Sequence, residues 1–475
     1  MFAEFWILKR RHDGIGCEEM HGTNVTVGIP HMPAEGARLE WRSAGAHAFA
    51  ILVAYVCIVL VAALFARFPN HFDELAHLSY AAAIAQHGLS GLDLFTIRLL
   101  PPNLAPEFTS EPNYLNHPAS YYLLLRPFLP SDGWPTLETV RVLRIANACL
   151  SALAVACALG VGILRRFEPR LLVTYSLMVI MTPVLLCIGG AINNDNLACL
   201  GGCVCVLGAQ LLQLDANSRR GWTMLVAGCT LAMLAKLTAG IMAGGFAVIF
   251  LGALWRVTGK SPSRICVLVL VAAVGLASLP YLWFIAAYGS PTPITPAYLG
   301  TYEHVATLFR SHPNLHTHGW VAGQHLSFVG YALQFLWWLL ADWNPVLVMT
   351  GPVSVAILLV PLALLLLAGA AWLRNWRLVQ GQDHLIWAGG IALAMVLPLH
   401  LAFSYRMYCA VGAPPFDAVP RYYFPLALSV LPVSACWLLS RIRGPAQPIL
   451  CWVLMLGLLL ASAVILASSL WVIKG

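Results

Sequence analysis

The sequence predicts an all-α polytopic membrane protein with about eleven transmembrane helices and two long outer loops that carry interfacial helices. Composition is the first reason: 60% of the 475 residues are hydrophobic and only 10% are charged, against about a quarter charged in a typical soluble domain. The second is the recurrence of apolar runs long enough to cross about 30 Å of hydrocarbon. The third is that lysines and arginines lie in short loops between those runs, which is typical of membrane topology and not of a nucleic-acid partner.

The apolar runs begin after a polar tail. Residues 1–45 are expected to form a poorly ordered cytoplasmic tail, and residues 46–475 a single membrane domain whose first run acts as a signal anchor. The runs that are readily identified as spans are 46–66, 142–164, 171–189, 196–214, 265–287, 350–373, 385–405, 421–440 and 449–472. The thirteen cysteines lie mostly inside such runs and form no CxxC pair, so we interpret them as small apolar side chains.

The stretch from Gly221 to Trp255 is too long for one crossing and rather short for two, with Lys236 as the only charge in its middle. Cationic residues flank it on both sides, so the positive-inside rule places both of its ends in the cytoplasm. These flanking residues are Arg219, Arg220, Arg256, Lys260 and Arg264. We therefore expect a hairpin of two helices within 221–256, with Lys236 between them on the outer side.

The same count places two long segments outside the membrane, 67–141 and 288–349. Within the second, residues 326–343 are apolar enough to resemble a span, but a crossing there would break the parity of the cationic loops that follow. Its tryptophans suit a membrane interface, so we expect an interfacial helix. This parity places the N-terminus in the cytoplasm and most of the polar candidate residues on the outer face.

The most informative polar stretch, FPNHFDELAH, runs from Phe68 to His77 directly after the first span. The apolar spacing that follows is helical, so Asp73 is expected at or near the N-cap of a helix, with His77 one turn further on. Asp73 and His77 would then face the same cavity at the water interface. The alternative is structural, because an aspartate before a helix is an ordinary cap and a histidine at a membrane edge is often only a hydrogen-bonding residue.

The FDELAH stretch resembles the acidic first-loop motif of the GT-C superfamily of glycosyltransferases, such as the dolichyl-phosphate-mannose mannosyltransferases, which use lipid-phosphate sugars. The segment NHPASYYLLL, which contains His117 and Tyr121, is similar to the HPPLYYLLL-type segment of those enzymes, although Ala119 replaces the second proline. Weaker matches follow in the family's order. They are Asn193-Asn194-Asp195, Lys236-Leu237-Thr238 and Arg421-Tyr422-Tyr423-Phe424-Pro425, the last like the RYL-P pattern.

The resemblance implies transfer of a sugar from a polyprenyl-phosphate carrier to a hydroxyl of a glycan or lipid acceptor, at the outer face of a bacterial inner membrane and in cell-envelope modification. Such a transfer needs a carboxylate that takes the acceptor proton and cations that stabilise the leaving phosphate. We expect Asp73, the catalytic acid of the motif, to be the general base of an inverting reaction, and Glu74 to orient acceptor or metal. Lys236 and Arg421 are the candidate phosphate ligands. The other candidate substrate-binding residues are His77, His117, Tyr121 and Asp195.

Simpler interpretations stay open for these residues. Lys236 could snorkel to the interface, Arg421 could contact lipid headgroups, and Asp195 could cap the fourth span instead of pairing with Lys236. Metal dependence is undecided, because two adjacent acids are compatible with a divalent ion, and no cofactor is otherwise expected. Outer-loop residues that could build an acceptor or metal site are Glu107, Glu111, His304, His312, His316, His318 and His325.

Other functions compete with the transferase. A multi-pass transporter or flippase of lipid-linked sugar would also have many spans and a few intramembrane charges. Against it, the spans carry almost no internal acids, and no pair of interrupted helices occupies corresponding halves. A polysaccharide polymerase or ligase and a membrane scaffold are further alternatives, and the acid pair beside the first span favours the transferase over both.

Overall fold

The computed structural model describes residues 35–69, 73–89, 91–259, 263–311, 326–341, 352–377, 383–415, 417–442 and 444–474. The chain divides into two compact units, Met1–Arg38 and Leu39–Gly475, and the account below concerns the second. The described residues are 77% helical, and they contain no strand beyond an isolated bridge between Arg98 and Pro112. The predicted all-α class is therefore confirmed. The expected tail 1–45 lies mostly outside the described residues.

The helices follow the chain in the expected order. They are α2 (Glu35–Phe65), α3 (Glu74–His87), α4 (Ser120–Leu125), η1 (Arg126–Phe128), α5 (Leu137–Leu164), α6 (Pro169–Ile180), α7 (Pro183–Gly189), α8 (Asp195–Leu214), α9 (Arg219–Ala235), α10 (Leu237–Thr258), α11 (Arg264–Tyr288), α12 (Pro296–Ser311), α13 (Phe328–Ala341), α14 (Pro352–Arg377), α15 (His384–Val411), η3 (Pro420–Tyr423), α16 (Phe424–Leu439) and α17 (Ala446–Lys474). Each apolar run singled out in the sequence corresponds to a helix or to a broken pair of helices.

Seven of the helices in the described ranges are long and apolar enough to cross a membrane, judged by length and composition. They are α2 from Ala44, α5, α8, α10, α11, α15 and the continuous segment of η3 and α16. Shorter apolar helical stretches lie in α6, α13, α14 and α17. The protein is thus a polytopic membrane protein, whereas a total of about eleven crossings stays a prediction.

The helices of two local expectations are confirmed, whereas the outer position of Lys236 stays a prediction. The stretch 221–256 forms two helices, α9 and α10, and Lys236 is the single residue between them, with an extended backbone at φ −163° and ψ 136°. Residues 326–341 contain one short apolar helix, α13. Its Tyr331 packs against Tyr405 and Tyr408 of α15, so α13 covers the end of α15. Its interfacial depth in the membrane stays a prediction.

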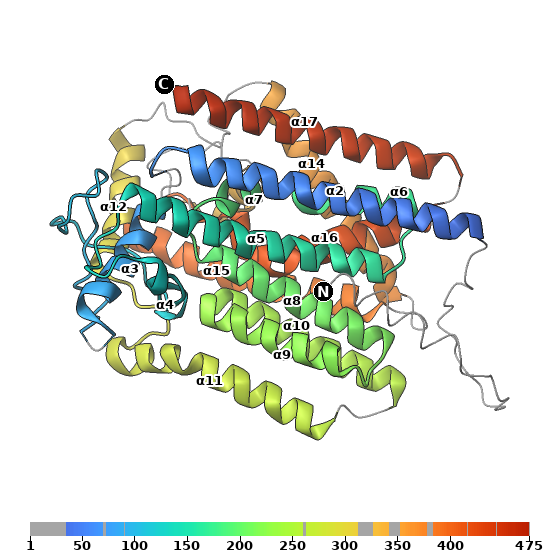
Figure 1. The fold of residues 1–475 in the computed structure, drawn as a ribbon, viewed down its shortest axis with the longest axis horizontal. Coiled ribbons are helices and arrows are strands. Elements are labelled where there is room, and N and C mark those ends of the chain that lie inside the picture. Colours follow the sequence, from blue (N-terminus) through green and yellow to red (C-terminus); the bar gives the residue numbers. More distant parts are fainter. Residues whose placement is uncertain are drawn as a thin grey trace. The chain divides into compact units, whose positions relative to one another are not determined.

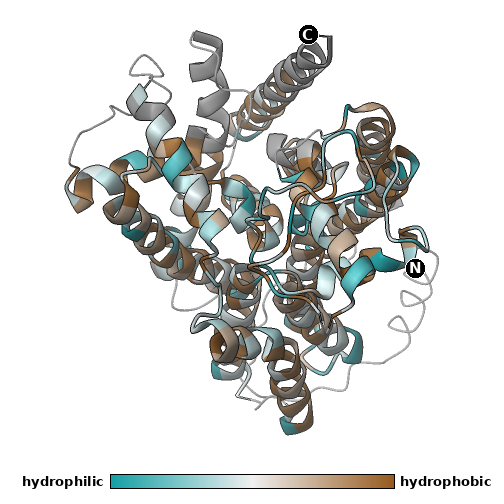
Figure 2. Cartoon of the chain, turned by 90° about the vertical axis from the view of Figure 1, so that its left-hand side faces the viewer, coloured by the Kyte–Doolittle hydropathy of each residue, from teal (hydrophilic) through white to brown (hydrophobic). Residues whose placement is uncertain are grey.

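The long helices run side by side, and the short helices α3, α4 and α12 gather at one end of them (Figure 1). Figure 2 views the unit from that end: the helices, seen along their axes, carry mainly apolar residues, and polar residues concentrate on the nearby loops and short helices. Helix α8 packs against α5, α9, α10 and α16. This arrangement makes α8 the central support of the end where the polar residues gather.

Glycines let α8 approach its neighbours closely. A Cβ atom on Gly201 would lie 2.4 Å from the backbone nitrogen of Ala232 in α9, and one on Gly202 would lie 1.8 Å from the carbonyl oxygen of Pro425 in α16. Small residues at such contacts are typical of helix packing in membranes, where dispersion replaces the hydrophobic effect as the main attraction. The close contacts hold the start of α8, the end of α9 and the start of α16 together.

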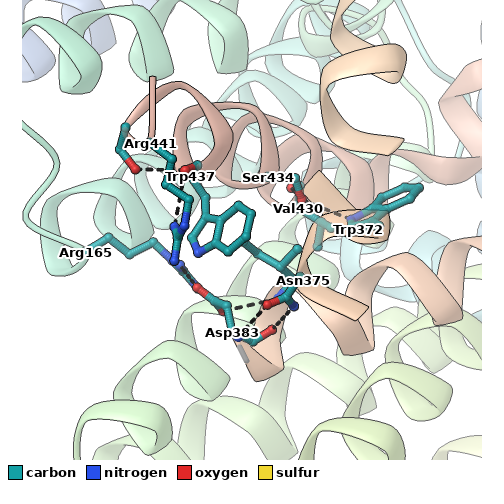
Figure 3. Close-up of polar contacts among 10 residues, drawn as sticks. Arg165, Trp372, Asn375, Asp383, Val430, Ser434, Trp437 and Arg441 are labelled. Atoms are coloured by element: carbon teal, nitrogen blue, oxygen red, sulfur yellow. Dashed lines mark hydrogen bonds and ion pairs between the residues drawn. The ribbon is translucent and has the colours of Figure 1, made fainter. Parts of the chain in front are cut away.

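An ion pair ties the helices together at the other end of the bundle (Figure 3). Arg165, which follows α5, donates through both terminal nitrogens to Asp383, and its Nη2 lies 2.9 Å from Asp383 Oδ1. Asn375 of α14 exchanges two hydrogen bonds with the backbone of Asp383, at 3.0 Å and 2.9 Å. Nearby, the Arg441 guanidinium stacks 3.6 Å from the centre of the Trp437 ring. These contacts join α5, α14 and α15.

Candidate active site

Four charged side chains form an alternating series at the end where the short helices gather. Asp73 Oδ2 lies 2.5 Å from Arg421 Nη2. Arg421 Nε lies 3.4 Å from Asp195 Oδ2, and Asp195 Oδ1 lies 3.0 Å from Lys236 Nζ. No member of the series is more than 9% exposed. We call these four residues the charge series; its two acids and two cations balance, as buried charges require.

Asp73 is the N-cap residue of α3, as the sequence predicted, but its side chain makes no capping hydrogen bond. The carboxylate instead receives a hydrogen bond of 2.8 Å from the Tyr114 hydroxyl and pairs with Arg421. An arginine and a phenol that both donate to a carboxylate stabilise its charged form, which is the form that can accept a proton. The simple capping interpretation of Asp73 therefore fails.

The simpler interpretations of Asp195 and Lys236 fail as well. Asp195 is the first residue of α8, whose N-cap is Asn194, and its own N–H donates to the Asn193 side chain at 2.8 Å. Its carboxylate pairs with Lys236, which is buried and does not extend toward lipid headgroups. The Lys236 ammonium also sits 3.8 Å from the centre of the Tyr422 ring, in a cation–π contact. Arg421 is 6% exposed, so it is not a surface lipid contact.

Glu74 lies outside the charge series. Arg144 of α5 binds its carboxylate through two nitrogens, each 2.7 Å from an oxygen, and the Ile192 backbone N–H donates to it at 3.2 Å. The same guanidinium donates to the carbonyls of Ala66 and Arg67, at 2.7 Å and 2.8 Å. Both members of this pair are at most 1% exposed. The pair therefore joins the end of α2 and the start of α3 to α5, directly beside Asp73.

His77 lies on the buried face of α3, and the rings of His117 and Tyr121 pack against it. The His77 ring stacks against the His117 ring at 6.3 Å between centroids, and its Nδ1 lies 3.0 Å from the Tyr122 hydroxyl. Burial lowers the pKa of His77 from 6.5 to about 3 and lowers the pKa of His117 well below that ordinary value. Both imidazoles are therefore neutral at pH 7. The Tyr121 hydroxyl donates to Asn147 at 2.8 Å.

A further buried carboxylate, Asp417, was not singled out from the sequence. Its two oxygens accept hydrogen bonds from Tyr302 of α12, at 3.0 Å, and from Ser404 of α15, at 2.6 Å. His400 bridges the Asp417 carbonyl and the Tyr423 hydroxyl, with both contacts at 3.0 Å. These bonds fix the loop that leads into η3, and therefore fix Arg421. The only sequence signal was a single acid in the short stretch between the predicted spans 385–405 and 421–440.

Arg144 could have been detected more readily. It lies inside the apolar run 142–164, and a charged residue within a predicted span is a functional or structural marker by default. The outer-loop candidates, by contrast, are not brought together: Glu107 and Glu111 are exposed, and His304 is exposed on α12. His312, His316, His318 and His325 lie outside the described residues. Among the residues that can be described, no group of three or more histidine, cysteine or acidic side chains could hold a metal ion.

The charge series places a pair of cations next to a carboxylate, and these two features have different chemical uses. Lys236 and Arg421 form a dicationic site, because the two oxygens of the Asp195 carboxylate lie against the two cations. Asp73 supplies a second carboxylate to Arg421, at Nη2. A base and a leaving-group site that share one arginine are suited to a displacement reaction in which a phosphate departs.

No protein-family model and no curated protein matches the sequence. Solved structures that resemble the fold include the oligosaccharyltransferase of Archaeoglobus fulgidus in complex with zinc and sulfate, at a TM-score of 0.44 and 16% identity, with 87% of this chain and 52% of that protein covered. Its apo form gives a TM-score of 0.46 and 13% identity, covering 89% of this chain and 56% of the other. The chain thus spans about half the length of that enzyme.

ArnT from Cupriavidus metallidurans in the apo state resembles the chain at a TM-score of 0.36 and 14% identity, covering 82% of this chain and 77% of ArnT. These TM-scores and identities mark a partial likeness in fold, so the chemistry has to be inferred from the chain's own residues.

Proposed function

We propose that this protein is a membrane glycosyltransferase that moves a sugar from a polyprenyl-phosphate carrier to an acceptor hydroxyl. The reaction takes place at the outer face of a bacterial inner membrane, with the N-terminus in the cytoplasm, and modifies a cell-envelope glycan or glycolipid. The observation that carries the proposal is the charge series: a carboxylate, Asp73, beside a buried dicationic site made by Arg421 and Lys236. A lipid-linked phosphate suits such a site because its charge needs cations and its tail needs an apolar bundle.

In the proposed reaction, the acceptor oxygen attacks the anomeric carbon of the sugar while its proton passes to the Asp73 carboxylate. The bond between the anomeric carbon and the phosphate oxygen breaks, and its electron pair leaves with the phosphate. Lys236 and Arg421 stabilise the charge that develops on the leaving phosphate. Attack opposite to the leaving group inverts the anomeric configuration, so no covalent sugar–enzyme intermediate forms.

The neighbouring residues receive supporting roles. Glu74 is bound on both oxygens by Arg144, so we assign it to positioning Asp73 and not to direct contact with a metal. His77, His117 and Tyr121 are proposed to line the sugar or acceptor side, where neutral imidazoles and a phenol donate or accept hydrogen bonds without adding charge. Whether a divalent ion takes part stays open, and no step above depends on one.

The test is sugar release from a panel of radiolabelled polyprenyl-phosphate sugars in proteoliposomes that contain an acceptor extract. Asp73→Asn should lower turnover by about 10²–10⁴-fold, the range of a general base, at matched expression and folding. Asp132→Asn is the matched control, since it makes the same substitution at an exposed acid of the same outer segment and should retain wild-type turnover. Retained turnover in Asp73→Asn would contradict the role of Asp73.

Complete absence of wild-type turnover across the panel, with folding confirmed, would instead favour a multi-pass transporter or flippase of lipid-linked sugar. In that case, proteoliposomes should move the labelled lipid between leaflets without releasing the sugar. Measuring both quantities on the same preparation separates the two functions.

A further inference from the structure

The carboxylate of Asp195 has an unusual position for an acid in a site that should bind an anion. Its two oxygens point to two different cations, with Oδ1 3.0 Å from Lys236 Nζ and Oδ2 3.4 Å from Arg421 Nε. A phosphodiester between the same cations would place its two free oxygens in the same way. The carboxylate therefore lies between the two cations and balances their charge, but it accepts a hydrogen bond from Lys236, whereas its contact with Arg421 Nε is an ion pair without a hydrogen bond.

We propose that Asp195 is a built-in stand-in for the donor phosphate: it neutralises Lys236 and Arg421 while the site is empty and is displaced when the lipid phosphate binds. This inference rests on the proposed function and assigns Asp195 as a positioning residue. Without Asp195, two buried cations would face each other across an empty site, which is strongly unfavourable in a low-dielectric environment. The acid thus keeps the site assembled between turnovers.

The local structure allows such a displacement. The backbone of Asp195 is fixed, because its N–H donates to the Asn193 side chain at 2.8 Å and α8 is packed tightly against α9 and α16. The printed contacts of the Asp195 carboxylate are with the side chains of Lys236 and Arg421 and not with the backbone of α8, so a rotation at Asp195 moves the carboxylate without moving the helix. The N-terminus of α8 carries a partial positive charge that still favours the carboxylate after this rotation.

The displacement also reaches Asp73 through Arg421. This guanidinium contacts Asp195 through Nε and Asp73 through Nη2, so the phosphate that replaces Asp195 competes with Asp73 for the same cation. The donor is a phosphodiester with one negative charge, so on binding it replaces Asp195 charge for charge. As the bond to the anomeric carbon breaks, the leaving phosphate gains a second charge, draws Arg421 more strongly than a carboxylate does and loosens its contact with Asp73. The base is therefore freed for the acceptor proton as the phosphate departs.

The test measures the affinity of the purified protein for decaprenyl monophosphate in detergent micelles by microscale thermophoresis. Asp195→Asn keeps the shape of the side chain and removes its charge, so it should bind the lipid phosphate at least tenfold more tightly than wild type. Asp383→Asn is the matched control, because it makes the same change in charge at the other end of the bundle. It should leave the affinity unchanged.

Equal affinities in wild type and Asp195→Asn would overturn the inference and leave the proposed function standing. Failure of every folded variant to bind decaprenyl monophosphate would overturn the proposed function itself, and the inference with it. If Asp195→Asn does not fold, the comparison is between Lys236→Met and the double variant Asp195→Asn/Lys236→Met. The stand-in role requires the double variant to bind the lipid more tightly than Lys236→Met, and weaker or equal binding would refute it.

Discussion

At the scale of single residues, Arg144 holds the segment around Asp73 in place, although it was not singled out from the sequence. It binds both oxygens of Glu74 and two backbone carbonyls at the end of α2. A lysine could not replace it, because an ammonium is a point donor and cannot present the planar fork that this geometry needs. Arg144 therefore fixes the backbone on both sides of Asp73 without touching a substrate.

Arg144→Met should destabilise the protein by about 3–5 kcal/mol, the usual cost of leaving one member of a buried ion pair without its partner. Thermal unfolding in detergent micelles measures this loss. The double variant Glu74→Gln/Arg144→Met, which leaves no unpaired charge, should recover part of it. If the loss of stability in the double variant equalled the sum of the losses in Glu74→Gln and Arg144→Met, the two residues would not be coupled.

The individual site residues were predictable to different degrees, for physical reasons. The acids and cations of the charge series stand out in the sequence because charge is rare in so apolar a chain. The pairing of Asp195 with Lys236 was one of two interpretations open from the sequence. The pairing of Asp73 with Arg421 was not readable, since the two lie far apart in sequence and meet only when α3 and η3 pack. The hydroxyl network of Asp417 gave the weakest signal, because tyrosine and serine occur throughout such chains and only their convergence is informative.

At the scale of elements, the contact of α8 with α16 determines where Arg421 lies. Gly202 faces the carbonyl of Pro425, four residues beyond Arg421, and a Cβ atom there would lie 1.8 Å from that oxygen. A side chain at this position must push the two backbones apart. The dicationic site would then widen, because Lys236 follows α9, which α8 also holds.

Gly202→Ala should therefore lower stability by about 1–3 kcal/mol, as overpacking does, and weaken binding of the lipid phosphate. Gly245→Ala in α10 is the matched control, since a Cβ atom there meets nothing within 4 Å. The control should be neutral or slightly stabilising, because alanine is the better helix former. Differential scanning fluorimetry compares the two variants, and equal melting temperatures would show that α8 and α16 adjust without cost.

The elements themselves were largely predictable, since apolar length and cationic loops are strong signals in membrane proteins. The break at Lys236 between α9 and α10 followed from charge bias alone. The break between α6 and α7 was not predicted, although Pro183 stands at the first turn of α7, where proline is tolerated and a preceding helix usually ends. Apolar content gives no information on which spans touch, so the central place of α8 could not be foreseen.

At the scale of the whole molecule, buried histidines make stability depend on pH. The pKa of His77 falls from 6.5 to about 3 in the folded protein because burial disfavours the charged ring. Between these values, the unfolded chain binds a proton that the folded protein excludes. The stabilisation is therefore complete above pH 6.5 and is lost as the pH falls toward 3.

His77→Gln should remove this contribution, which amounts to about 2 kcal/mol between pH 7.5 and pH 5 for one such group. The variant loses the Tyr122 contact at every pH, so the informative quantity is the change with pH and not the absolute stability. Unfolding midpoints at the two pH values measure it. His87→Gln, at the exposed end of α3, should keep the wild-type dependence, and an identical dependence in His77→Gln would contradict the assignment.

The balance of the charge series has a consequence for how a donor is captured. Two acids and two cations in contact have no net charge, so their field decays within a few ångströms and does not extend along the membrane surface. The resting site therefore exerts no long-range pull on anionic lipids, and a donor must arrive by lateral diffusion and be recognised on contact. Capture should then be almost independent of ionic strength, and abundant phospholipid headgroups gain no electrostatic advantage in competing for entry.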